Sequence, residues 1–236
     1  MLTLAVDTSA KSVSAALVED GMLLAQYSQC CGLTHSRTLM PMVEALLRNT
    51  GRKREELSRL AVSAGPGSFT GVRIGIAAVK GLAWALEKPA VGVSTLEAMA
   101  WHALGQPEGT VICCAMDARR GQLYNALFAL RGGQPERLTP DRAISLEELA
   151  QEEKMRAGRT FVVGDGARLC YNGLRERGLA PVLAPPPLEH QSAWGVAMAA
   201  GDRPGTDAKE LLPVYLRLSQ AERERQARLQ KEGERL

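Results

Sequence analysis

Asp7, Thr8 and Ser9 directly follow the first apolar stretch of this chain, residues 2–6, and could bind a phosphate there. A carboxylate and two hydroxyls at the end of a strand are groups that can hold a metal–phosphate unit, and backbone N–H groups of such a turn can surround the phosphate oxygens. The alternative is an ordinary polar turn, in which these side chains bond only local backbone. For the three residues alone, we favour the ordinary turn.

A second candidate for phosphate binding is the turn made by Gly65 and Gly67, which flank a proline just before a predicted helix at residues 68–86. The free N–H groups at a helix N-terminus attract anions. The turn lacks the Gly-x-x-x-x-Gly-Lys-Ser/Thr pattern of a P-loop. A tight connection from strand to helix is an equal alternative.

Asp117 stands in a context similar to that of Asp7. Aligned without a gap, each aspartate follows an apolar strand and precedes a polar turn and a second strand. The match spans only about a dozen positions and suggests two related lobes that face each other across a cleft. Two lobes that each offer one such turn are the layout of actin-like ATPases and sugar kinases. Arg119 and Arg120 lie in the Asp117 turn, either as solvated charge or as contacts to phosphate or carboxylate.

Other catalytic chemistries find little support in the sequence. The three histidines have no metal-binding spacing, and none neighbours a cysteine. No Gly-x-Ser-x-Gly elbow occurs. The five cysteines, an odd number with two adjacent pairs, indicate reduced thiols rather than a disulfide framework or a zinc site. We therefore name no catalytic residue and no metal ligand.

The predicted elements would position these residues in an α/β fold. Those of the first half are strands at 2–6, 12–18 and 22–27, a helix at 36–49, a strand at 60–64, the helix at 68–86, a strand at 90–93 and a helix at 94–101. Those of the second half are strands at 111–116 and 121–130, a helix at 145–157, a strand at 160–164 and a short helix at 194–200. We expect a first lobe at 1–104 joined by a segment near 208–220, a second lobe at 105–207, and a charged tail at 219–236.

Two helices of the first lobe carry apolar and small residues suited to a contact surface. These residues are Leu39, Met42, Val43 and Leu46 on the first helix and Gly71, Ile74, Gly75 and Ala78 on the second. Glycine in a helix interior costs about 1 kcal/mol against alanine, and close packing of a neighbour against the helix can require it. That neighbour is either the sheet of this chain or another polypeptide, and the sequence does not divide the residues between them.

Composition sets the remaining bounds. A chain of 236 residues makes one or two domains, and a net charge of +3 is too small to argue for nucleic-acid binding. The sequence has no signal-peptide pattern and no apolar run that we expect to span a bilayer. We expect a cytoplasmic protein with no membrane contact. The tail at 219–236 is predicted to be a solvated helix or a frayed terminus, and a basic arm for RNA is the alternative.

Five motifs occur in order: Asp-Thr-Ser at 7–9, Ser-Ala-Gly-Pro-Gly-Ser-Phe-Thr-Gly-Val-Arg-Ile-Gly at 63–75, Asp-Ala-Arg-Arg-Gly at 117–121, Gly-Asp-Gly-Ala at 164–167 and Pro-Val-Tyr-Leu-Arg at 213–217. Together they resemble the TsaB family, also called YeaZ. The resemblance covers nearly the whole chain up to the tail, and the Gly-Pro-Gly-Ser-Phe-Thr-Gly block is its most specific part.

The resemblance implies an actin-like ATPase fold, also called ASKHA, of two lobes that each have a mixed sheet flanked by helices. It implies a noncatalytic role in forming threonylcarbamoyladenosine next to the anticodon of tRNA, in support of a catalytic paralogue, TsaD, and a small ATPase, TsaE. In this family the two helices of the first lobe contact the paralogue, and the same face makes homodimers. ATP or ADP would bind within the complex, and no cofactor is certain for this chain alone.

An older label for the superfamily, glycoprotease, implies metallopeptidase activity. The catalytic paralogue has a His-His-Met-Glu-Gly-His segment, two of whose histidines bind metal, and the matching positions here are Thr95 and Met99. A hydroxyl and a thioether replace a pair of imidazoles poorly. The resemblance therefore argues against transferase and peptidase activity of this chain alone. An actin-like ATPase or small-molecule kinase is the first alternative function, and a metallopeptidase is a weaker one.

Overall fold

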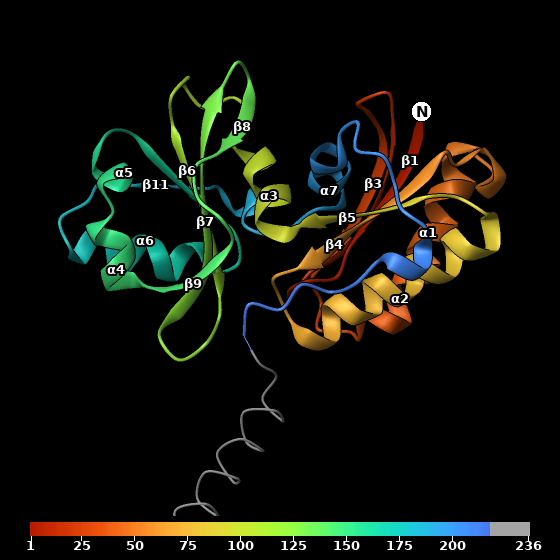
Figure 1. Ribbon diagram of the computed structural model, residues 1–236, viewed down its shortest axis with the longest axis horizontal. Coiled ribbons are helices and arrows are strands. Elements are labelled where there is room, and N and C mark those ends of the chain that lie inside the picture. The colour runs from red at the N-terminus through yellow and green to blue at the C-terminus, as the bar shows by residue number, and fades with distance from the viewer. Residues whose placement is uncertain (218–236) are drawn as a thin grey trace, which may run out of the picture.

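The structure, a computed structural model, describes residues 1–217 and places two mixed sheets next to each other (Figure 1). Each sheet has helices on both faces, and two helices, α3 (Thr95–Ala100) and α7 (Ala193–Ala200), lie between the sheets. Four short 3-10 segments complete the described elements, at Arg54–Glu56, Trp101–Ala103, Pro186–Leu188 and Ala208–Glu210. The predicted tail at 219–236 lies outside the described residues.

The first sheet has the strand order β3-β2-β1-β4-β5. Its strands are β1 (Leu2–Asp7), β2 (Val13–Glu19), β3 (Met22–Gln29), β4 (Arg59–Gly65) and β5 (Ala90–Ser94). Strands β1, β2 and β3 form an antiparallel meander, and β4 and β5 run parallel to β1. Because β1, β4 and β5 are parallel, their carboxyl ends meet at one edge of the sheet, which faces the second lobe.

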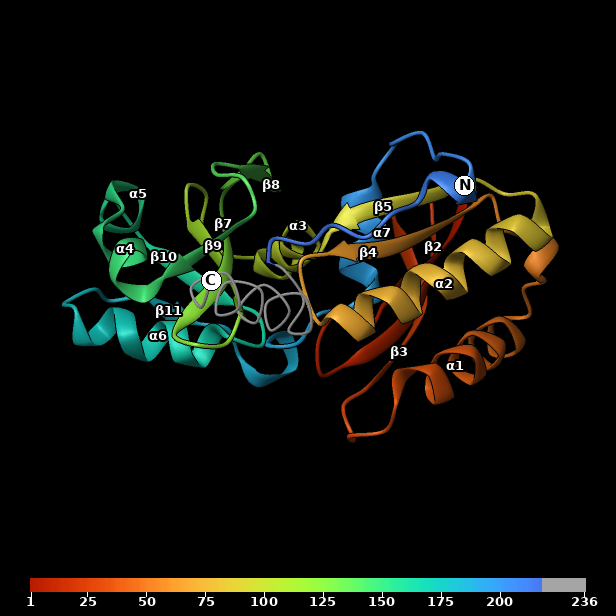
Figure 2. The same cartoon turned by 60° about the horizontal axis from the view of Figure 1, so that its bottom comes forward.

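Helices α1 (His35–Thr50) and α2 (Phe69–Leu86) pack side by side on one face of this sheet (Figure 2). Gly51 ends α1 in the left-handed conformation, and the Ser68 hydroxyl caps the N-terminus of α2. By length and composition alone, α2 would allow a membrane span, which the sequence analysis did not anticipate. Its inner side, with Val72, Ile76 and Val79, is part of the first core, so we interpret it as a core helix.

Helix α7 corrects the predicted boundary of the second lobe at residue 207. It packs on the opposite face of the first sheet, against β1, β2, β4 and β5. Ala193, Val196 and Ala200 are fully buried there, because the meander leaves this face of the sheet without a cover of its own. Thr206 then pairs with Ala90 at the sheet edge. The chain therefore returns to the first lobe before α7 begins.

The second sheet has the order β11-β10-β6-β7-β8, with β9 also paired to β7. Its strands are β6 (Val111–Asp117), β7 (Gln122–Arg131), β8 (Gln134–Arg137), β9 (Arg142–Ser145), β10 (Thr160–Val163) and β11 (Val182–Leu183). Helices α4 (Leu146–Gln151), α5 (Glu153–Arg156) and α6 (Ala167–Glu176) lie on its outer side, and α3 covers its inner face. The single helix predicted at 145–157 is thus two helices, because Glu152 is extended.

Residues 211–217, which we call the C-terminal strap, run from the first lobe toward the second (Figure 2). The Val214 N–H donates to the Ala64 carbonyl at 2.7 Å, which fixes the strap to the end of β4. The Arg217 guanidinium donates to the Ala118 carbonyl in the second lobe at 2.5 Å. The strap therefore connects the two lobes at the edge where the parallel strands end.

Candidate functional site

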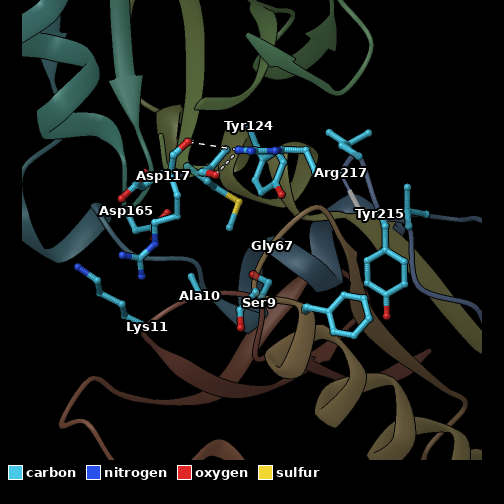
Figure 3. Close-up of a pocket in the computed structure, with 16 residues that line it drawn as sticks. Ser9, Ala10, Lys11, Gly67, Asp117, Tyr124, Asp165, Tyr215 and Arg217 are labelled. Atoms are coloured by element: carbon cyan, nitrogen blue, oxygen red, sulfur yellow. Dashed lines mark hydrogen bonds between the residues drawn. The ribbon is translucent and has the colours of Figure 1, made fainter. Parts of the chain in front are cut away.

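A pocket of about 400 Å³ lies between the lobes at the carboxyl ends of the strands (Figure 3). The β1–β2 turn contributes Ser9, Ala10 and Lys11, and the strap contributes Tyr215 and Arg217. The segment that leads into α2 contributes Gly67, Ser68 and Phe69. From the second lobe come Asp117, Ala118, Arg119, Tyr124 and Asp165. Of the six residues predicted to bind nucleotide or phosphate, Ser9, Gly67 and Asp117 line this pocket.

Asp7 does not reach the pocket. Its carboxylate is fully buried and accepts hydrogen bonds from the Ser9 backbone N–H at 3.0 Å, from the Ser9 hydroxyl at 2.9 Å and from the Ser63 hydroxyl. Burial raises the pKa of the Asp7 carboxyl above its usual value, and the bonds from Ser63 and Ser9 oppose this shift. The carboxylate therefore stabilises the turn instead of facing a ligand.

Thr8 and two glycines of α2 form a tight intramolecular contact. The Thr8 hydroxyl donates to the Gly71 carbonyl at 2.7 Å. A Cβ added at Gly71 would overlap the Thr8 carbonyl oxygen, and one at Gly75 would overlap the Thr8 hydroxyl. The close neighbour of these glycines is therefore the β1–β2 turn of the same chain. The prediction that Gly71 and Gly75 admit a partner is wrong in this structure.

Gly65 and Gly67 allow two other close backbone contacts near the β1–β2 turn. Gly65 has φ +119° and lies so close to the Val214 carbonyl that a Cβ would overlap it. A Cβ at Gly67 would overlap the Ser9 carbonyl oxygen, which accepts a hydrogen bond from the Ser68 N–H at 2.7 Å. These two positions bring the strap and the start of α2 against the strand ends, which leaves Gly67 on the pocket wall and Gly65 outside it.

Two carboxylates of the second lobe line the pocket. Asp117 is exposed and accepts a hydrogen bond from the Arg119 backbone N–H at 2.8 Å. Asp165 accepts one from the Gln191 amide at 3.2 Å, and burial raises the pKa of its carboxyl above the usual value, an effect that Gln191 and Lys11 oppose. Asp165 is not among the six residues predicted to bind nucleotide or phosphate, although it lies in the Gly-Asp-Gly-Ala motif at 164–167.

Thr95 and Met99 are fully buried on α3. Met99 packs in the inner core of the second sheet with Leu96 and Cys114, and the Thr95 hydroxyl has no hydrogen-bond partner within residues 1–217. In that described part of the chain, no three His, Cys, Asp or Glu side chains are grouped to hold a metal ion. The hydroxyl and thioether at Thr95 and Met99 do not fit the metal that the family resemblance implies for the catalytic paralogue at this segment.

The structure also divides the residues predicted for a partner surface on α1 and α2. Leu39, Val43 and Leu46 are at most 3% exposed in the first core, so the prediction that they contact a partner is wrong in this structure. Their spacing placed them on the apolar side of α1, and that side faces the sheet. Met42, Ile74 and Ala78 are half-buried and remain accessible at the surface.

The sequence matches one family model and is similar to named proteins. A family model described as TsaD, tRNA N6-adenosine threonylcarbamoyltransferase, matches residues 29–163. The chain is 33% identical over 229 residues to the tRNA threonylcarbamoyladenosine biosynthesis protein TsaB of Bacillus subtilis, which covers 94% of this chain and 96% of that protein.

Solved structures are similar in fold. YeaZ from Pseudomonas aeruginosa matches with a TM-score of 0.78 at 30% identity, over 91% of this chain and 99% of that chain. The ethanolamine utilization protein EutJ from Carboxydothermus hydrogenoformans matches with a TM-score of 0.50 at 12% identity, over 84% and 90% of the two chains, which concerns the fold alone. The predicted fold class, an actin-like ATPase fold with two mixed sheets flanked by helices, is confirmed.

Proposed function

This chain belongs to the TsaB family, and we propose that it is a noncatalytic subunit of the complex that forms threonylcarbamoyladenosine in tRNA. Its task would be to bind and support a TsaD-like catalytic homologue, together with a TsaE-like ATPase, while tRNA is the substrate of the complex. Cytoplasmic location is part of the proposal. The match of residues 29–163 to the TsaD description supports a structural relationship between this chain and such a partner.

The single observation that carries the noncatalytic role is the buried state of the residues that would do chemistry. Asp7 is buried and does not line the pocket, and its oxygens accept hydrogen bonds from Ser9 and Ser63 inside the lobe. Thr95 and Met99 lie in the interior at the segment where the paralogue holds metal. The metallopeptidase alternative gains no support from Thr95 and Met99, and the kinase alternative keeps only Asp117 as an accessible carboxylate of its two aspartates.

The outward side of α2 supports a helical partner surface. It carries Ala77, Gly81 and Ala85, which are exposed and lie one helical turn apart, with the half-buried Ile74 and Ala78 next to them. A Cβ at Gly81 would have open space around it. This glycine therefore differs from Gly71 and Gly75, because nothing in residues 1–217 requires it.

A glycine in a helix interior lowers helix stability by about 1 kcal/mol relative to alanine. No contact within the described residues requires glycine at position 81, but the close approach of another helix would, since small residues let two backbones come near each other. We call Ile74, Ala77, Ala78, Gly81 and Ala85 the outer α2 stripe. The same stripe would serve a homodimer, because in a two-fold interface one surface meets its own copy. Homodimer and heterodimer would then compete.

Gly81→Leu tests this proposal, because it fills the stripe without touching the core. An overpacked contact costs about 1–3 kcal/mol, and every 1.4 kcal/mol changes affinity tenfold. We expect the affinity for the TsaD-like homologue, measured by calorimetry, to fall by about tenfold or more. Asn172→Leu, at an exposed position on α6, is the matched control and should bind like the unmodified chain. Equal affinity of the two variants would contradict the proposed surface.

A further inference from the structure

Four exposed cations lie in the lining of the pocket between the lobes or next to its lining residues. Lys11 of the β1–β2 turn and Arg119 of the β6–β7 turn line the pocket. Arg73, in the first turns of α2, contacts the lining residue Tyr215, and Arg120 follows Arg119 in the chain. Within residues 1–217 none of the four forms a salt bridge with an aspartate or glutamate. The basic charge of these side chains is therefore not neutralised by ion pairs in the described part of the protein.

Aromatic rings lie among these cations. The rings of Phe69 and Tyr215 stack with centroids 4.5 Å apart, and both line the pocket (Figure 3). The Arg73 guanidinium lies 3.8 Å over the Phe69 ring and donates a hydrogen bond to the Tyr215 hydroxyl at 2.7 Å. Tyr215 is 38% exposed. Guanidinium groups next to an accessible aromatic ring are the groups that contact the phosphates and bases of unpaired nucleotides.

The two arginines of the β6–β7 turn are held in an unusual backbone conformation. Arg119 has φ +66° and Arg120 has φ +57°, a region that glycine and asparagine adopt far more readily than arginine. Arg217 of the strap donates to the carbonyls of Ala118 and Arg119, at 2.5 and 3.2 Å, and supports the turn from the first lobe. The cost of this conformation at two consecutive arginines is consistent with a role for their side chains at this place.

We infer that the surface formed by Lys11, Arg73, Arg119, Arg120 and the ring of Tyr215 binds an unpaired stretch of the tRNA substrate. The inference rests on the proposed function. Asp117 and Asp165 also line the pocket and repel phosphate from their side of it. The phosphates of the RNA therefore lie against the basic side chains, and a base stacks on Tyr215.

An acidic protein is the competing occupant of a basic surface. The stacked rings favour RNA, because every base offers a flat face to an aromatic side chain, whereas acidic side chains do not. The substrate class of the family named for tRNA modification agrees with this choice.

The experiment measures binding of a fluorescently labelled anticodon stem-loop of unmodified tRNA to the full-length chain by anisotropy, over a range of salt concentrations. Arg119→Asn combined with Arg120→Asn removes two charges, and asparagine tolerates the positive φ. Lys154→Asn combined with Arg175→Asn removes two exposed charges from α5 and α6, on the outer side of the second lobe. All variants keep the tail at 219–236, so its contribution is common to them.

We expect the Arg119/Arg120 variant to bind roughly tenfold more weakly or worse, with the slope of log K against log salt reduced by about 1.4 for two phosphate contacts in a single strand. The Lys154/Arg175 variant should change affinity less than about twofold. Tyr215→Ala should weaken binding by about tenfold while leaving the salt slope unchanged, because stacking involves no counterion release.

Equal losses in the two double variants, or no loss in the Arg119/Arg120 variant, would overturn the inference. A weaker affinity of that variant for the TsaD-like homologue, with RNA binding unchanged, would also overturn it and make the surface a protein contact. The proposed function is tested separately. It would fail if Gly81→Leu and Asn172→Leu bound the TsaD-like homologue equally well, whatever the result with RNA.

Discussion

The hydroxyl of Ser63 on β4 donates a hydrogen bond to the carboxylate of Asp7 at the end of β1, in the interior of the first lobe. The bond joins two neighbouring parallel strands at the edge of the first sheet that faces the second lobe. The other carboxylate oxygen of Asp7 accepts hydrogen bonds from the backbone N–H and the hydroxyl of Ser9, so both oxygens are used within the lobe. In this chain, the aspartate of the Asp-Thr-Ser motif therefore has a structural role in the turn and does not face a ligand.

Asp7→Asn should change how stability depends on pH. The pKa of Asp7 is raised in the folded chain by burial. A group with a raised pKa contributes stability that is present below its unfolded value, 3.8, and is lost as pH rises through the folded value. The free energy of unfolding of the variant, relative to the unmodified chain, should therefore increase as pH rises from below 3.8 toward neutrality, in denaturant titrations. A difference that stays constant or decreases with pH would show that Asp7 is not held in this way.

The two kinds of glycine in α2 should respond oppositely to alanine. Gly81→Ala should stabilise the isolated chain by about 1 kcal/mol, because alanine is the better helix former and its Cβ meets open space. Gly71→Ala should destabilise it by about 1–3 kcal/mol, because the Cβ overlaps the Thr8 carbonyl oxygen. Chemical denaturation measures both. Changes of the same sign would refute the division between the inner and outer sides of α2.

Leu46→Ala should act on folding and not on assembly. Leu46 is fully buried in the first core, and truncation of such a leucine costs about 2–5 kcal/mol. The folded fraction should still bind the TsaD-like homologue with unchanged affinity, measured below the temperature at which the variant unfolds. A fall in affinity with no loss of stability would return Leu46 to the partner surface.

The cysteines should divide into two reactive and three protected thiols. Cys30 and Cys31 are exposed, while Cys113, Cys114 and Cys170 are buried. The backbone N–H of Leu33 lowers the pKa of the Cys31 thiol, which favours its reactive form, and burial raises the pKa of Cys114. Titration with a thiol reagent should modify Cys30 and Cys31 in the native protein and the other three only after denaturation. Rapid modification of Cys170 in the native state would contradict the packing of α6 against the second sheet.

The sequence predicted the order and type of most elements, since apolar periodicity, caps and turns are local features. It could not place α7, because an apolar helix fits any uncovered sheet face, and only the fold shows which one is open. The sequence could not assign the contacts of α2 either, because it does not show which surface packs against each side of the helix. Small residues marked a close approach, but only the structure assigns Gly71 to Thr8 and leaves Gly81 without a neighbour.

The gapless alignment of the Asp7 and Asp117 segments does not hold through the turns that follow them. Asp7 pairs across the strands with Ser14, whereas Asp117 pairs with Leu123. The turn of the second lobe is therefore one residue shorter, which an alignment without a gap could not show. Asp7 is buried, and Asp117 is exposed at the pocket.

The most direct test of the central claim is tRNA modification with this chain left out. Unmodified tRNA, threonine, bicarbonate and ATP are incubated with the TsaD-like and TsaE-like proteins, and threonylcarbamoyladenosine is measured by mass spectrometry of the digested tRNA. We expect that modification requires this chain and that the chain alone is inert. We also expect that Asp7→Asn restores activity while Gly81→Leu does not. Modification that proceeds equally well without this chain would contradict the supporting role.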